Sequence, residues 1–177
     1  MALLSQLRGI LTALTLVCLA SIGTAHAATD GLYGWQPCPD SLAEDGGAAP
    51  TKKWDLTLSP YTYHWHYSAE HRPVKLVAMD SHVSGGRFCG LAVFTNSFGQ
   101  ASTYVYAGKQ WDGLFGNPKL FTKVSAGLLW GYRGEYKDKI PFNQAGVAPA
   151  IIPSLGYTFT PQDSAQAYLL GNAGLLF

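Results

Sequence analysis

One segment of the chain carries polar side chains at alternate positions: Thr62, His64, His66 and Ser68. In a β-strand alternate residues share a face, and the opposite face here carries only tyrosine and tryptophan. An imidazole can act as a general base near neutral pH, because its unperturbed pKa lies there. The segment therefore predicts a strand whose polar face points into a barrel and offers a histidine base.

Two other interpretations of these residues stay open. A small barrel needs a polar, hydrogen-bonded interior in any case, so the side chains could be structural. A metal site is the second, because His64 and His66 would present two imidazoles on one face, with Glu70 and His71 close behind. That set has no cysteine and no firm third ligand, so neither a metal nor a cofactor is expected.

A second polar cluster spans residues 95–99, Thr-Asn-Ser-Phe-Gly. Asparagine, serine and glycine in this order are ordinary turn residues. On spacing alone the cluster predicts a turn between two strands. Asn96 and Ser97 become candidate site residues through the resemblance described below.

The strands that must position these residues follow from alternating patterns separated by turn residues. They are expected at 53–67, 74–80, 88–94, 101–111 and 120–132, with two more sharing 142–159 and a closing strand at 165–177. Pro60 should interrupt the first strand, and Pro149 and Pro153 should disturb the sixth and seventh. The closing strand has an apolar face formed by Ala165, Ala167, Leu169, Gly171, Ala173, Leu175 and the terminal Phe177.

The amino-acid composition indicates what surrounds the predicted strands. Charged residues make up 13% of the chain and aromatic residues another 13%. Few charges, many aromatics and no apolar stretch long enough for a membrane helix are typical of a barrel with one face in lipid. The sequence therefore predicts an all-β protein, an eight-stranded antiparallel transmembrane β-barrel of the bacterial outer membrane, at residues 52–177.

The region before the barrel is expected to direct export. Residues 1–27 have the features of a secretory signal: one charge at Arg8, an apolar run and an Ala-His-Ala cleavage site. Residues 28–51 are expected to form a periplasmic lead-in. Loss of Arg8 leaves eleven Lys and Arg against eleven Asp and Glu, so no nucleic-acid partner is expected. A closed barrel has no free strand edge and is expected to be a monomer.

Topology places the connections alternately at the two ends of the barrel. The turns near Glu70, Asn96, Lys137 and Asp163 are expected outside the cell. Those near Ser84, Gly113 and the 150s are expected in the periplasm. Cys38 and Cys89 remain after signal removal, and the oxidising periplasm permits a disulfide; the sequence leaves open whether the two meet.

Several stretches resemble the lipid A palmitoyltransferase (PagP) family of eight-stranded outer-membrane barrels. Residues 55–64 (DLTLSPYTYH) are similar to that family's first strand, in which an aromatic residue precedes the catalytic histidine. Residues 90–91 with 94–98 (FTNSF) resemble its aromatic-x-Asp-Ser-aromatic motif, and 107–111 (AGKQW) its Ala-Gly-x-Gly-Trp stretch. Residues 153–157 (PSLGY) and Phe177 also resemble the family. These short patches are scattered over residues 54–177.

The resemblance implies an outer-membrane enzyme that moves a palmitoyl chain from a phospholipid to a hydroxyacyl chain of lipid A. His64 would take the proton of the acceptor hydroxyl, and Ser97 would either attack the ester or stabilise the oxyanion. Asn96 replaces the family's aspartate. Either its amide N–H₂ donates a hydrogen bond to the oxyanion, or another carboxylate orients His64. Gln110 replaces a glycine that lies at the bottom of the family's acyl-chain pocket, so the resemblance does not imply which acyl-chain length this protein prefers.

Other arrangements compete with this site. Asp80-Ser81 is expected at a periplasmic turn, far from His64, whereas Asp163-Ser164 is expected in an outer loop. His66 and Ser68, two apart on one face, would suit a lipid A deacylase barrel. A small structural or adhesive barrel without a lipid cavity is the non-enzymatic alternative.

Overall fold

The computed structural model describes residues 35–171 and 174–176 of the chain. The chain divides into two units, Met1–Trp35 and Gln36–Phe177, and every described element belongs to the second. The predicted signal peptide (1–27), the start of the lead-in (28–34) and Phe177 lie outside the described residues. No helix in the described part has the length and hydropathy that a membrane crossing needs.

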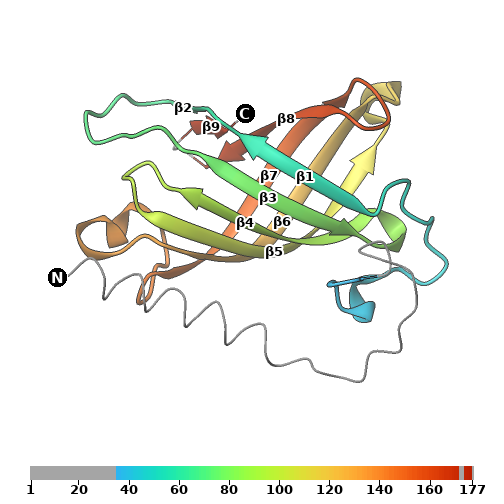
Figure 1. Ribbon diagram of the computed structural model, residues 1–177, viewed down its shortest axis with the longest axis horizontal. Coiled ribbons are helices and arrows are strands. Elements are labelled where there is room, and N and C mark those ends of the chain that lie inside the picture. Colours follow the sequence, from blue (N-terminus) through green and yellow to red (C-terminus); the bar gives the residue numbers. More distant parts are fainter. Residues whose placement is uncertain (1–34, 172–173, 177) are drawn as a thin grey trace. The chain divides into compact units, whose positions relative to one another are not determined.

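The described strands form one antiparallel sheet that curls into a barrel-like form (Figure 1). The helical elements in this part are short 3-10 turns, so the expected all-β class is confirmed. The strands are β1 (Trp54–Ser59), β2 (Thr62–His64), β3 (Leu76–His82), β4 (Arg87–Thr95), β5 (Ala101–Asp112), β6 (Leu120–Trp130), β7 (Val147–Thr158), β8 (Ser164–Leu170) and β9 (Gly174–Leu176). Their order across the sheet is β1-β3-β4-β5-β6-β7-β8-β9-β2.

The first predicted strand is interrupted at Pro60, as expected. β1 pairs with β3, whereas β2 pairs with β9 at the other end of the strand order. Because β1 and β2 are consecutive in the chain, one interrupted segment contributes to both ends of the sheet. The strand stops at His64, so the expected continuation to residue 67 is wrong: a bend and turn replace it.

The two strands expected within 142–159 are a single strand, β7. Pro153 pairs with Val124 and Pro149 with Leu128 inside the β6–β7 ladder. The β7–β8 ladder covers only Ser154–Thr158, so both prolines lie where β7 has no β8 partner in the described residues. A proline has no backbone N–H group, and at such an edge no neighbouring strand is present to accept a hydrogen bond from one.

The predicted closing strand is a hairpin. β8 ends at Leu170, and Gly171, with φ +57°, begins the turn to β9. A positive φ favours glycine, which has no Cβ to clash. Since 142–159 holds one strand, Asp163 lies at the same end as the turns at Ser84 and Gly113, and its expected place beside Asn96 is wrong.

The two faces of the sheet differ as alternation predicts. The inner face holds the buried cluster Ala78, Ala92, Tyr104 and Leu129. The outer face presents large apolar side chains to the surroundings, with Leu56 68% exposed and Ile151 72% exposed. Others on the strands are Leu58, Val77, Met79, Leu91, Val93, Val105, Leu128, Trp130, Val147, Leu155 and Leu169.

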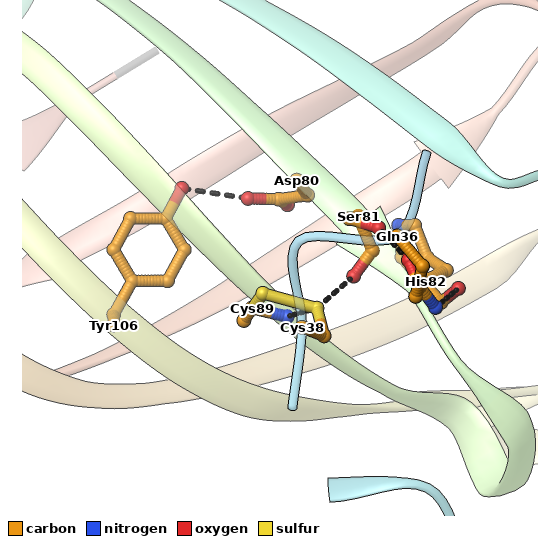
Figure 2. Close-up of a disulfide and its surroundings, with 7 residues drawn as sticks. All are labelled: Gln36, Cys38, Asp80, Ser81, His82, Cys89 and Tyr106. Atoms are coloured by element: carbon orange, nitrogen blue, oxygen red, sulfur yellow. Dashed lines mark hydrogen bonds between the residues drawn. A yellow bond between two sulfur atoms is a disulfide. The ribbon is translucent and has the colours of Figure 1, made fainter. Parts of the chain in front are cut away.

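The two cysteines meet in a disulfide between the lead-in and β4 (Figure 2). Cys38 is buried against Cys89, with 5.5 Å between their Cα atoms. Two residues before Cys38, Gln36 Oε1 accepts a hydrogen bond from the Ser81 hydroxyl of β3 at 2.5 Å. The start of the described lead-in is therefore bonded covalently to β4 and by a hydrogen bond to β3.

Candidate active site

His64 and Ser97 are in contact although 33 residues separate them. The Nε2 atom of His64 lies 2.7 Å from the Oγ atom of Ser97. His64 is the last residue of β2, and Ser97 lies in the turn between β4 and β5. The sequence singled out both residues, and the sheet brings them together at one end, called the His64 end below.

The turn at residues 96–100 presents Ser97. The Oδ1 atom of Asn96 accepts hydrogen bonds from the backbone N–H groups of Phe98 and Gln100, each at 3.0 Å. This is the Asx-type bonding that asparagine favours in turns. Gly99 has φ +77°, and a Cβ there would lie 2.9 Å from the Arg72 side chain. The turn residues thus fix the position of the half-buried Ser97.

Asn96 itself is committed to this turn. It is 1% exposed, and its Nδ2 donates to the Oε1 atom of Gln100 at 3.3 Å. Gln100 in turn accepts from Arg133 N and donates to Arg133 O. The side-chain contacts of Asn96 therefore hold two loops together, and none of them is to His64 among the described residues. Of the three predicted site residues, only His64 and Ser97 meet.

His71 contacts His64 in a way that the sequence did not predict. Its ring stacks on the His64 ring with centroids 4.2 Å apart and an interplanar angle of 26°. The sequence offered it only as a metal ligand. A stack of ring faces does not converge two ring nitrogens on one ion. The contact depends on how the loop 65–75 folds, and no short sequence signal reports that.

The other candidate pairs are not at this site. His66 is exposed after the end of β2, and the Ser68 hydroxyl accepts a hydrogen bond from Glu70 N at 3.3 Å. Asp80 and Ser81 lie within β3 and are buried, so their expected place at a turn is wrong. Asp163 hydrogen-bonds Thr160 at the opposite end from His64, so the Asp163-Ser164 pair cannot supply its carboxylate.

An inner cavity of about 340 Å³ opens beside His64 and Ser97. Thr62 joins these two residues in its lining. The wall further in is mainly apolar. Lys139, the last residue of η4 (Gly134–Lys139), also lines the cavity, as do Ile140 and Pro141 directly after it. The apolar wall consists of Val74, Leu76, Ala78, Ala92, Phe94, Leu129, Ala150, Ile152 and Leu170.

Charged and phenolic side chains close the cavity at its inner end. Lys123 Nζ lies 3.0 Å from Asp80 Oδ2 and 3.1 Å from Asp55 Oδ2. His82 Nε2 lies 2.9 Å from the same Asp55 oxygen. The Tyr106 hydroxyl donates to Asp80 Oδ1 at 2.6 Å (Figure 2). This set is called the buried ion cluster below.

The buried ion cluster has the ligand types of a cation site. Asp55, Asp80 and His82 offer one ligand atom each within 4.8 Å of one another. The ammonium group of Lys123 already bonds both carboxylates, so it supplies the positive charge that a metal ion would bring. The donor set therefore fits an internal ion pair network rather than a metal site.

The His64 end also carries an aromatic group with a cation beside it. The Phe98 ring stacks on Tyr136 with centroids 4.4 Å apart, and Lys139 Nζ lies 5.4 Å from the Phe98 centroid. Lys139 also lies 3.8 Å from a carboxylate oxygen of Glu70. This exposed pair contributes little stability, but it places a cation at the entrance of the cavity.

No protein-family model matches the chain, and neither a curated protein nor a solved structure matches it.

Proposed function

We propose that this protein is an outer-membrane acyltransferase of the lipid A palmitoyltransferase type, which moves a palmitoyl or similar fatty acyl chain from a phospholipid to lipid A. The observation that carries the proposal is the 2.7 Å contact between His64 Nε2 and Ser97 Oγ beside a cavity with an apolar wall. A base within hydrogen-bond distance of a hydroxyl is the arrangement that activates a serine nucleophile.

The proposed reaction has two acyl transfers. Ser97 Oγ attacks the carbonyl carbon of a phospholipid ester while His64 Nε2 takes its proton. The bond to the glycerol oxygen then breaks, and that oxygen receives the proton from His64. An acyl-serine remains, with its chain in the cavity.

The second transfer reverses these steps with a different alcohol. A hydroxyl group of a lipid A acyl chain gives its proton to His64 and attacks the acyl-serine. The Ser97 oxygen leaves and recovers the proton. Each cycle exchanges one ester for another, so no cofactor, metal or redox partner is required.

The outer face of the sheet supports a membrane location. Large apolar residues project from β1, β3, β4, β5, β6, β7 and β8. An exposed apolar band of this extent is unusual in a soluble monomer and marks a lipid or protein contact. In an outer-membrane barrel the outward residues form such a band. The His64 end would then face the outer leaflet, where lipid A resides.

The strand order supports an eight-stranded barrel. β1 and β2 are parts of one interrupted strand, and β9 is the short eighth strand that pairs with β2. Bacterial barrels of this class have an even number of strands, with eight as the minimum. The eight strands proposed here are not all the predicted segments, because β7 replaces two predicted strands and the β8–β9 hairpin replaces one.

A lateral opening would let lipid chains reach the cavity. In the described residues β7 pairs with β8 only from Ser154 onward, although it begins at Val147. The unpaired part contains Pro149 and Pro153 and includes cavity-lining residues such as Ala150. Proline cannot donate to a ladder, so the two prolines favour an open edge on this side.

The proposal is tested by expressing the gene in a Gram-negative bacterium whose lipid A lacks the added chain. Mass spectrometry should show lipid A heavier by one acyl group in the wild type, and no gain in the Ser97→Ala or His64→Ala variants. Ser68→Ala is the matched control and should keep the gain. Loss of a chain would instead indicate the deacylase, and unchanged lipid A would indicate a structural barrel; either result contradicts the proposal.

A further inference from the structure

We infer that His71 is a positioning residue for His64: its stacked ring holds the His64 imidazole towards Ser97. The inference rests on the proposed function and concerns how that site works without a carboxylate. Its structural basis is the 4.2 Å ring stack, which nothing in the sequence motifs implies.

The need for such a residue follows from what His64 lacks. A catalytic histidine is usually oriented by a carboxylate that also stabilises the imidazolium. In the described residues no carboxylate forms an ion pair with His64. Asn96 is occupied by its own turn, and the Glu70 carboxylate is paired with Lys139. The face of the His71 ring is stacked against His64 instead.

His71 is held firmly enough to orient another side chain. Its backbone N–H donates to Ser68 O at 3.1 Å, and the next residue, Arg72, donates its N–H to Ser97 O at 2.7 Å. The rings of Phe98 and His71 pack edge-to-face with centroids 5.8 Å apart. The loop that carries His71 is thus bonded directly to the residue that His64 must activate.

His71 meets His64 through its ring face and not through a ring nitrogen. The two rings stack with centroids 4.2 Å apart, and the Nδ1 atom of His71 is buried with no hydrogen-bond partner in the described part of the chain. His71 therefore acts on His64 through contact between the ring faces, which leaves His64 Nε2 within 2.7 Å of Ser97 Oγ.

Two substitutions separate this role from simple packing. His71→Phe keeps an aromatic face but no nitrogen, and His71→Leu keeps a similar volume without a ring. We expect His71→Phe to retain kcat within about threefold, and His71→Leu to lower kcat by about 10- to 100-fold with KM unchanged, the scale of a misplaced catalytic group. His66→Leu, at the exposed neighbouring histidine, is the control and should change neither value.

A measurement that needs no turnover accompanies the kinetics. In detergent micelles the ring protons of His64 should show an upfield ring-current shift that persists in His71→Phe and disappears in His71→Leu. If the wild type transfers no acyl chain, the proposed function fails, whatever the spectra show. If the wild type is active and His71→Leu matches His71→Phe in kcat, or if KM changes instead of kcat, the positioning role is wrong.

Discussion

The ammonium group of Lys123 lies 3.0 Å from a carboxylate oxygen of Asp80, and both side chains are almost completely buried. This contact joins β6 to β3 across the inside of the sheet. The same ammonium also bonds Asp55 of β1. The inner end of the cavity is therefore closed by charges that neutralise one another rather than by apolar packing.

Removal of the Lys123 charge should destabilise the protein strongly. Lys123→Met leaves Asp55 and Asp80 buried with no ammonium group between them. Breaking a buried ion pair by removing one partner costs about 3–5 kcal/mol, so we expect a loss of that size in the free energy of unfolding, measured with urea in micelles. Lys119→Met, which removes a lysine placed over the Tyr157 ring, should cost less than about 1 kcal/mol. Equal losses in the two variants would contradict the role of the buried ion cluster.

Asn96 should matter for the turn rather than for proton transfer. Asn96→Ala removes an acceptor for two backbone N–H groups and a contact to Gln100. Leaving such groups unsatisfied costs about 1–3 kcal/mol, and the looser turn should lower acyl transfer. Thermal unfolding and lipid A mass spectrometry on the same variant check this. A variant with full thermal stability but no transfer would show instead that the Asn96 amide acts in the reaction.

The disulfide should stabilise the protein through the loop that it closes. Cys38 and Cys89 are 51 residues apart, and the chain-entropy argument gives about 4 kcal/mol for a loop of that length. We expect the Cys38→Ala, Cys89→Ala double variant to lose an amount of this order in urea unfolding. A reductant should lower the stability of the wild type towards the variant and leave the variant unchanged. An unchanged wild type under complete reduction would contradict the prediction.

Strand periodicity alone located much of the sheet. The alternation at 88–94, 101–111 and 120–132 predicted β4, β5 and β6 to within two residues at each end, because each strand has one inner and one outer face. Pro60 marked the break between β1 and β2 for an equally local reason. These features depend only on residues that are neighbours in the sequence, so they can be predicted from it.

The errors arose where the outcome depends on distant partners. Pro149 and Pro153 suggested a break, yet β7 is continuous because its edge there has no β8 partner in the described residues. The apolar alternation continues past Gly171, which conceals the turn between β8 and β9. The His64–Ser97 pair could be named from the motif resemblance, whereas the His71 stack depends on the path of a loop that carries no periodic signal.

The most direct test of the account is to follow one labelled chain in a purified system. The protein in detergent micelles is given a phospholipid with a deuterated palmitoyl group and an unlabelled lipid A. We expect the label in lipid A and, in a rapidly quenched sample, an acyl-serine at Ser97 detected by peptide mass spectrometry. Labelled free fatty acid with unlabelled lipid A, or no release of label at all, would contradict acyl transfer by His64 and Ser97.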